Sequence, residues 1–221
     1  NLKLLGERNF GVSMAVLAIF GIGMLGGTYL LPLYMQKGLG YTAIMAGSVF
    51  LPVGLIQGVL STCSGFLTRY VKPLFIAVTG ILVMTLSFYF ASRFTLHTTH
   101  AQIMLVLYLR GFGMGLTFAP LNDFSLMNLS QCDMASAAGI SNSIKQLSGS
   151  VSIALLTVIL SGRTAFHSAQ GGLSSAESYV AGISDDFLFV TFVSLASALP
   201  FLWLLRPRRK AASFKSEGTG T

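Results

Sequence analysis

Charged residues are scarce in this sequence. Only 10% of the 221 residues are Asp, Glu, Lys or Arg, whereas 53% are hydrophobic and the mean hydropathy is +0.73. A soluble domain carries about 25% charged residues, so the composition excludes an ordinary soluble fold. The net charge of +7 does not indicate nucleic acid, because the cations lie at the ends of apolar blocks and no basic patch with interleaved aromatic residues is present.

Groups that intramembrane enzymes require are missing from the apolar blocks. His97, His100 and His167 all fall between blocks, so no buried serine–histidine pair is expected, and no paired aspartates lie within a block. His97 and His100 have no nearby cysteine or acid to complete a metal site. Cys63 lies inside an apolar block and Cys132 in a connection, which argues against a disulfide. The sequence therefore predicts no enzyme, no metal and no cofactor.

Acidic residues are few, and all are expected in connections or at helix ends. None is therefore expected to carry protons within the membrane. We expect another part of the protein to supply carboxylates to a shared cavity. The seven acids are Glu7, Asp123, Asp133, Glu177, Asp185, Asp186 and Glu217.

The apolar residues are grouped in six blocks. Each block is roughly 20 residues long, which is the length that a helix needs to cross about 30 Å of hydrocarbon. A bilayer offers no water to backbone groups, so each block must be helical. The sequence predicts an all-α membrane protein with six transmembrane helices, at about 10–34, 42–67, 73–92, 102–121, 137–160 and 187–205. The stretch 161–186 is expected to be a solvated external loop, and the basic tail 206–221 a disordered segment in the cytoplasm.

The distribution of Lys and Arg predicts the orientation. Six spans place both termini on one side, together with the second and fourth connections. That side carries nine cations and the opposite side three, which favours cytoplasmic termini by the positive-inside rule. The nine are Lys3, Arg8, Arg69, Lys72, Arg206, Arg208, Arg209, Lys210 and Lys215, and the three are Lys37, Arg93 and Arg163.

Glycine is concentrated in particular blocks. Small residues four positions apart let helices approach closely in lipid. The third and sixth blocks have one glycine and none, so we expect these two on the lipid-facing outside, the other four inside, and a three-plus-three internal repeat. The alternative is that glycine is simply common in membrane helices. The spaced pairs are Gly23 and Gly27, Gly54 and Gly58, and Gly111 and Gly115.

Arg110 is the most informative single residue, because it lies near the middle of the fourth block. A cation at that depth costs about 2.5–3.5 kcal/mol on insertion scales, so it needs water, a partner or a function. One interpretation is a substrate pathway, and the alternative is an arginine that holds backbone carbonyls between helices. The predicted pathway residues are Tyr29, Gln57, Arg110, Met114 and Thr117, and Gly113 and Leu121 share the face of Arg110.

The fifth block carries a second cation at mid-depth, Lys145, within a polar stripe. Such a stripe must face protein or water, so it predicts either a helix interface or a cavity wall. The stripe is formed by Ser141, Asn142, Lys145, Gln146, Ser148, Gly149 and Ser152.

Several motifs, in order, are similar to one transporter family. The run 109–121, with LRGFGMG followed by FAPL, resembles the tenth core helix of EmrB/QacA-type exporters, which are fourteen-helix drug:proton antiporters of the major facilitator superfamily. The runs 29–36 (YLLPLYMQ) and 40–47 (beginning GYTA) resemble their seventh-to-eighth helix junction. The stretch 135–149, with ASAAG and KQLSG, resembles their eleventh core helix. At Arg69 this sequence departs from the superfamily pattern, which often has Asp there.

The resemblance implies the C-terminal half of a transporter, with its N-terminal half before Asn1. It implies proton-driven export of small amphipathic compounds across the cytoplasmic (inner) membrane, with small-molecule substrate and protons as ligands. It also implies a periplasmic adaptor and an outer-membrane channel as partners in Gram-negative relatives. A siderophore, metabolite or lipid precursor is an alternative cargo, because a fold does not fix its substrate. A membrane scaffold is a third interpretation.

Overall fold

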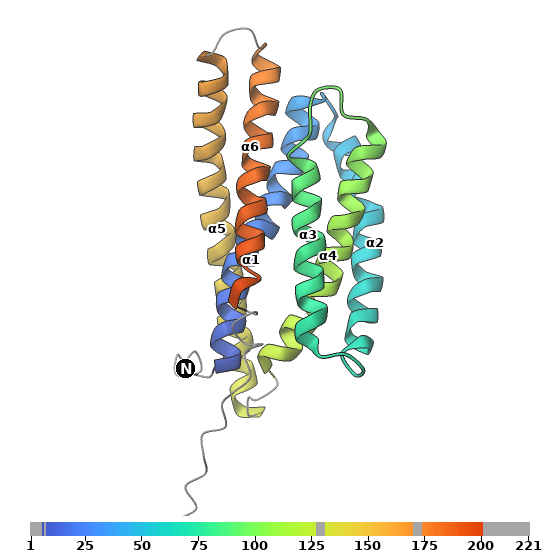
Figure 1. Ribbon diagram of the computed structural model, residues 1–221, viewed down its shortest axis with the longest axis vertical. Coiled ribbons are helices and arrows are strands. Elements are labelled where there is room, and N and C mark those ends of the chain that lie inside the picture. Colours follow the sequence, from blue (N-terminus) through green and yellow to red (C-terminus); the bar gives the residue numbers. More distant parts are fainter. Residues whose placement is uncertain (1–5, 7, 127–130, 170–173, 201–221) are drawn as a thin grey trace, which may run out of the picture.

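The computed structural model describes residues 6, 8–126, 131–169 and 174–200. Six long helices make up this part of the chain, and all six are long and apolar enough to cross a membrane (Figure 1). The predicted all-α fold with six spans is confirmed. The helices are α1 (Arg8–Leu33), continued by the π-helical turn η2 (Tyr34–Gly38), α2 (Ala43–Leu67), α3 (Pro73–Ala91), α4 (His100–Leu126), α5 (Gln131–Ala169) and α6 (Ser175–Ala196). The predicted tail 206–221, the end of the sixth predicted helix, Glu7, Glu217 and the side chain of Cys132 lie outside the described residues.

Local sequence explains where several helices begin. The side chain of Thr42 caps α2 by accepting a hydrogen bond from the backbone N–H of Met45. Pro73 occupies the first position of α3, where its missing N–H costs nothing. Ser174 and Glu177 form a capping box at the start of α6, with hydrogen bonds of 3.2 and 2.7 Å.

Helices α5 and α6 are longer than expected. The predicted external loop 161–186 is wrong, because α5 continues to Ala169 and α6 begins at Ser175. The capping box starts α6 well before the apolar block that marked its predicted beginning at 187. As a result α5 and α6 form a long hairpin, whose two arms stand side by side (Figure 1).

The helices form two groups of three. Helix α1, from the first half of the sequence, packs against α5 and α6 from the second half. Helix α4, from the second half, packs against α2 and α3 from the first half. The groups meet where α3 contacts α6 and α1 contacts α4. This exchange of partners between the two halves is the arrangement that a three-plus-three repeat would produce.

Burial differs sharply among the helices. In the most apolar stretch of each span, 61% of the residues of α1 and 56% of those of α3 are buried, against 17% for α2 and 28% for α5. Within this chain, α3 is thus more buried than α2 and α5. The expected position of the third and sixth helices against lipid stays a prediction. Gly80 of α3 explains part of the difference, because a Cβ there would lie 2.8 Å from the carbonyl oxygen of Gly113 on α4. By contrast, Gly54 and Gly58 of α2 have nothing within 4 Å of such a Cβ.

Candidate functional site

Arg110 of α4 is buried and reaches across to α1. Its side chain is 3% exposed, and its two terminal nitrogens donate hydrogen bonds to the carbonyl oxygens of Gly27 and Met24, both at 3.0 Å. A third hydrogen bond goes to the hydroxyl of Thr28. Only Nε lacks a partner in the described part of the chain. The guanidinium is therefore held by backbone dipoles, as in the alternative in which an arginine holds carbonyls between helices.

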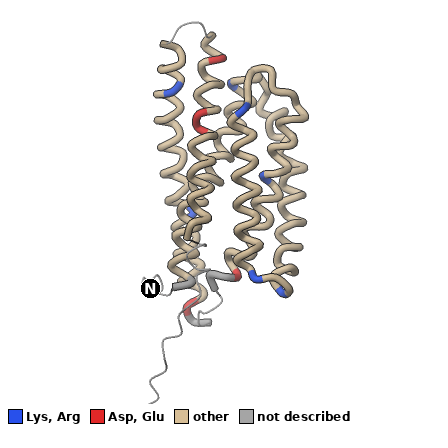
Figure 2. Tube along the Cα trace, in the orientation of Figure 1, with Lys and Arg blue, Asp and Glu red and all other residues tan. Residues whose placement is uncertain are grey.

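This contact joins the two groups of helices, because α4 belongs to one group and α1 to the other. Few charged residues lie along the middle of the helices (Figure 2). Carbonyl oxygens in a helix have a second lone pair, so Met24 and Gly27 accept from Arg110 without leaving their own helix. Arg110 makes no ion pair with a described residue, since both ion pairs there involve Asp185. Neutral dipoles, rather than an acid, thus accommodate this cation within the chain.

The face of α4 that carries Gly113, Met114 and Thr117 packs against α3. Thr117 is fully buried and donates to the carbonyl oxygen of Gly113 in its own helix at 2.7 Å. A Cβ on Gly80 would lie 2.9 Å from the backbone nitrogen of Thr117, so the two helices are almost in backbone contact. Met114 is half-buried against the core. A role for Met114 and Thr117 in transport stays a prediction.

The remaining predicted pathway residues lie in other places. Tyr29 is half-buried and lines a cavity of about 470 Å³ with Thr157 and Tyr179, from α5 and α6. Gln57 of α2 is half-buried, and its carbonyl oxygen lies 3.0 Å from where a Cβ of Gly115 would be. The structure therefore distributes the five predicted residues over several helix contacts and does not gather them around one cavity.

The polar stripe of α5 is divided between two surroundings. Ser152 donates to the carbonyl oxygen of Ile22 on α1 at 2.7 Å, and Ser148 and Gly149 are buried against the same helix. Asn142 and Gln146 are exposed.

Lys145 lies between these two parts of the stripe. It is half-buried, and its ammonium stands 5.4 Å from the ring centroid of Phe118 on α4. This distance is within the range of a cation–π interaction.

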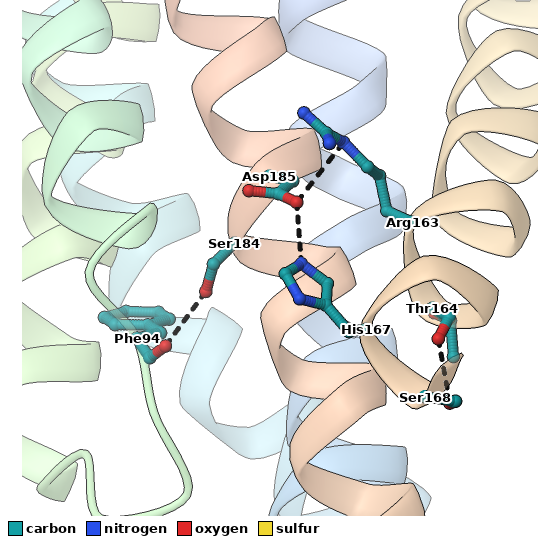
Figure 3. Close-up of polar contacts among 7 residues, drawn as sticks. All are labelled: Phe94, Arg163, Thr164, His167, Ser168, Ser184 and Asp185. Carbon is teal, nitrogen blue, oxygen red and sulfur yellow. Dashed lines mark hydrogen bonds and ion pairs between the residues drawn. The ribbon is translucent and has the colours of Figure 1, made fainter. Parts of the chain in front are cut away.

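A charged cluster on the α5–α6 hairpin was missed by the sequence analysis (Figure 3). One carboxylate oxygen of Asp185 lies 3.0 Å from Nε2 of His167 and 3.3 Å from Nε of Arg163. Next to it, Ser184 donates to the carbonyl oxygen of Phe94 at 2.9 Å and fixes α6 at the level of the α3–α4 connection. Asp185 and His167 line an open cavity of about 560 Å³.

Two sequence-based expectations are corrected here. Asp185 and Asp186 lie inside α6, not in a loop, and His167 lies inside α5. Asp186 is fully buried, and neither of its carboxylate oxygens has a hydrogen-bond partner among the described residues. The Ser-x-x-Glu pattern at Ser174 and Glu177 was the signal that could have placed these acids in a helix.

Six apolar spans around buried polar contacts define a multi-pass α-helical membrane protein. The sequence pattern of the Major Facilitator Superfamily matches residues 2–153. The chain therefore belongs to this superfamily, whose members are transporters and not enzymes.

Individual proteins of the superfamily are also similar to this chain. An uncharacterized MFS-type transporter, YhcA of Bacillus subtilis, is 32% identical over 73% of this chain and 30% of its own length. The multidrug export protein EmrB of Haemophilus influenzae is 30% identical over 77% of this chain and 34% of its own length. The fatty acid resistance protein FarB of Neisseria gonorrhoeae is 24% identical over 94% of this chain and 47% of its own length. The chain thus spans less than half the length of these relatives and is distantly related to drug efflux proteins.

Proposed function

We propose that this chain is the C-terminal half of a proton-coupled exporter of small amphipathic compounds in the cytoplasmic membrane. The observation that carries the proposal is the open face of α2 and α5. These helices are apolar enough to span a membrane, yet 17% and 28% of their most apolar stretches are buried. Relatives that include multidrug export proteins are matched over only part of their length.

The open face of α2 suits a helix partner better than lipid. Its residues include Gly47, Gly54 and Gly58, which are exposed and have nothing within 4 Å of an added Cβ. Glycines in a row allow close helix approach in a membrane, where van der Waals packing drives association. The N-terminal half of the same transporter is the partner that fits this face. We propose that this chain has both of its termini in the cytoplasm, which the distribution of its Lys and Arg residues favours.

Lys145 supports a shared cavity. It stands on α5 at the edge of the exposed residues Asn142 and Gln146, and no described residue forms an ion pair with it. A cation inside a membrane protein pairs with an anion or with backbone carbonyls, or it faces water, and no contact of Lys145 with a backbone carbonyl is described. We propose that the N-terminal half supplies that anion.

The class of compound that is exported has a second candidate besides small amphipathic drugs. FarB is named for fatty acid resistance, and it is matched over 94% of this chain. A lipid-like or other metabolite cargo is therefore the second candidate. A periplasmic adaptor and an outer-membrane channel would be further partners if the cell has an outer membrane.

The experiment measures efflux by the wild type and by a variant with a substitution on the exposed face of α2. The full-length gene is expressed in a drug-sensitive strain, and accumulation of a fluorescent cationic dye and of a fluorescent fatty acid is followed before and after an uncoupler. We expect dye accumulation to be lowered in an uncoupler-sensitive way. Gly54→Leu is expected to abolish this effect, because a large side chain separates the two halves.

Thr79→Leu is the matched control, because Thr79 is an exposed residue of α3, a helix that is not part of the proposed contact. Normal efflux by Gly54→Leu would contradict the proposed packing of α2. Unchanged accumulation of both probes in the wild type would contradict export of either class.

A further inference from the structure

Asp186 is a buried acid with no partner. It lies in the middle of the 22-residue α6, its side chain is 0% exposed, and neither carboxylate oxygen makes a hydrogen bond in the described part of the chain. Buried carboxylates in proteins are almost always paired or hydrogen-bonded, because water no longer solvates the charge. An unpaired one is therefore a candidate for function.

The seam between α5 and α6 contains two further unpaired polar groups. Ser178, Gly182 and Asp186 recur every four residues and share one side of α6. Opposite them, Thr164 of α5 lies so close that a Cβ on Gly182 would be 2.7 Å from its hydroxyl oxygen. The hydroxyls of Ser178 and Thr164 are buried and have no hydrogen-bond partner among the described residues. The contact between α5 and α6 (the α5–α6 seam) thus places a carboxyl group near buried hydroxyls that lack hydrogen-bond partners among the described residues.

Asp185, the residue before Asp186, belongs to a partly exposed cluster of ionisable side chains. Asp185 points in a different direction from Asp186, because successive residues of a helix are rotated by about 100°. It contacts His167 and Arg163, and the side chains of Asp185, His167 and Arg163 are 25%, 21% and 52% exposed. Asp185 and His167 line the cavity of about 560 Å³ that the α3–α4 connection also borders. Figure 3 shows the cluster with Phe94 of that connection nearby. The buried acid therefore lies next, along α6, to a partly exposed cluster of ionisable groups, and the charges of Asp185 and Arg163 act on it.

No described residue on the neighbouring elements forms an ion pair with Asp186, although the charge of Arg163 acts on it. Arg163 pairs with Asp185, and Tyr34 donates its hydroxyl to the carbonyl oxygen of Thr95. Helix α3 has one ionisable residue, Tyr89, and it is exposed. The ionisable residues on α6 and on the elements packed against it near this end are Tyr29, Tyr34, Lys37, Arg163, His167, Glu177, Tyr179 and Asp185, and Arg93 and His97 of the α3–α4 connection line the same cavity.

A proton is the ligand that suits this site. A metal ion needs several oxygen ligands, and no group of three or more His, Cys, Asp or Glu residues able to hold one occurs among the described residues. Protonation needs only the carboxyl group itself and removes the charge that burial disfavours. We propose that Asp186 reversibly binds one proton, exchanged with water through the Arg163–Asp185–His167 cluster, and thereby takes part in proton coupling. This inference rests on the proposed exporter function.

In the proposed step, the Asp186 carboxylate accepts one proton from a hydronium ion in the water next to the cluster, so that one O–H bond of hydronium breaks as one forms on the carboxyl group. The products are a water molecule and a neutral carboxylic acid. It later returns the same proton to water when the α5–α6 seam opens. No other bond is made or broken. The step therefore moves one charge into and out of the bundle.

The first test detects the protonated acid without any transport assay. Infrared spectra of the purified full-length protein are recorded over a pH series in H₂O and D₂O. We expect a carbonyl band of a buried carboxylic acid that disappears in Asp186→Asn, shifts in Asp186→Glu and persists in Asp123→Asn. Asp123 is a suitable control because it is an exposed acid at the end of α4. A wild-type spectrum without this band, or a band unaffected in Asp186→Asn and Asp186→Glu, would overturn the proton site.

The second test measures coupling in proteoliposomes with radiolabelled tetraphenylphosphonium as the probe. Asp186→Asn is expected to retain probe exchange in the absence of a gradient and to lose at least tenfold of its pH-gradient-driven accumulation. Equal accumulation by Asp186→Asn and wild type would overturn the coupling role. If the wild type transports no probe while the infrared band titrates, the exporter proposal fails and the proton site stands. If Asp186→Asn does not fold, Asp186→Glu gives both measurements.

Discussion

The two cations inside the helices, Arg110 and Lys145, meet different surroundings. Arg110 of α4 is 3% exposed and donates to two carbonyl oxygens and one hydroxyl of α1. Lys145 of α5 is half-buried, and the contact described for it is the ring of Phe118. One cation is satisfied by this chain, whereas the other stands beside a face that the chain leaves open.

The same contrast applies to whole helices. Helix α4 lies between α2 and α3 and is tied to α1 by Arg110, so its polar groups find partners within the six helices. Helices α2 and α5 each bury one side and expose the other. A residue that joins the two groups should therefore govern stability, and a residue on the open face should govern transport.

The largest effect on stability is expected for Arg110→Ala. Loss of the charge-assisted hydrogen bonds to Met24 and Gly27 should lower the free energy of unfolding by about 3 kcal/mol. Arg110→Lys should recover less than half of this loss, because an ammonium cannot reproduce the planar set of donors. The measurement is the temperature at which half of the detergent-solubilised full-length protein loses its monodisperse elution peak.

Arg93→Ala is the control for this prediction, because Arg93 is exposed and its described side-chain contacts are a hydrogen bond to the hydroxyl of Tyr89 and a cation–π contact with the same exposed ring. It should change the free energy of unfolding by less than about 0.5 kcal/mol. Wild-type stability in Arg110→Ala, combined with lost efflux, would show that Arg110 acts on cargo and not between helices.

Lys145→Ala is expected to affect transport more than stability. Loss of the interaction with Phe118 should cost about 0.5–1 kcal/mol. If the N-terminal half supplies an anion, leaving that anion unpaired should reduce the efflux rate by about tenfold or more. Lys145→Arg should keep most of the activity.

Efflux by Lys145→Ala is measured from the release of preloaded dye, and its unfolding temperature by the same elution assay. A large drop in stability with normal efflux of the remaining folded protein would assign Lys145 to the interior of the bundle. That result would remove the distinction between the two cations.

Hydropathy and local signals predicted the number of helices well. Each apolar block is long enough to span a bilayer, and the third helix begins at residue 73, as predicted. The start of α6 was missed because residues 175–186 are rich in polar side chains, and hydropathy alone does not separate a polar helical end from a loop. The capping box at Ser174 is the local signal that places the start of α6 there.

Tertiary partners were beyond what a single sequence contains. The depth of Arg110 predicted a special environment, and carbonyl contact was one of two alternatives, but nothing in the sequence identifies Met24 and Gly27 as acceptors. Glycine spacing showed that close contacts exist, not which side each helix presents: Gly80 contacts α4, whereas Gly54 is open. Asp186 was misplaced with the loop, so its burial could not be foreseen.

The smallest expected effect concerns the part of the α5 stripe that faces α1. Ser152→Ala removes the hydrogen bond to the carbonyl oxygen of Ile22, which should cost about 0.6 kcal/mol, the average for such bonds between membrane helices. Ser150→Ala is the matched control, because the exposed hydroxyl of Ser150 bonds only to the carbonyl oxygen of Gln146 in its own helix. Both variants should keep normal efflux. Equal unfolding temperatures for the two would mean that α1 and α5 are held together by packing at Gly149 and Leu156, without help from Ser152.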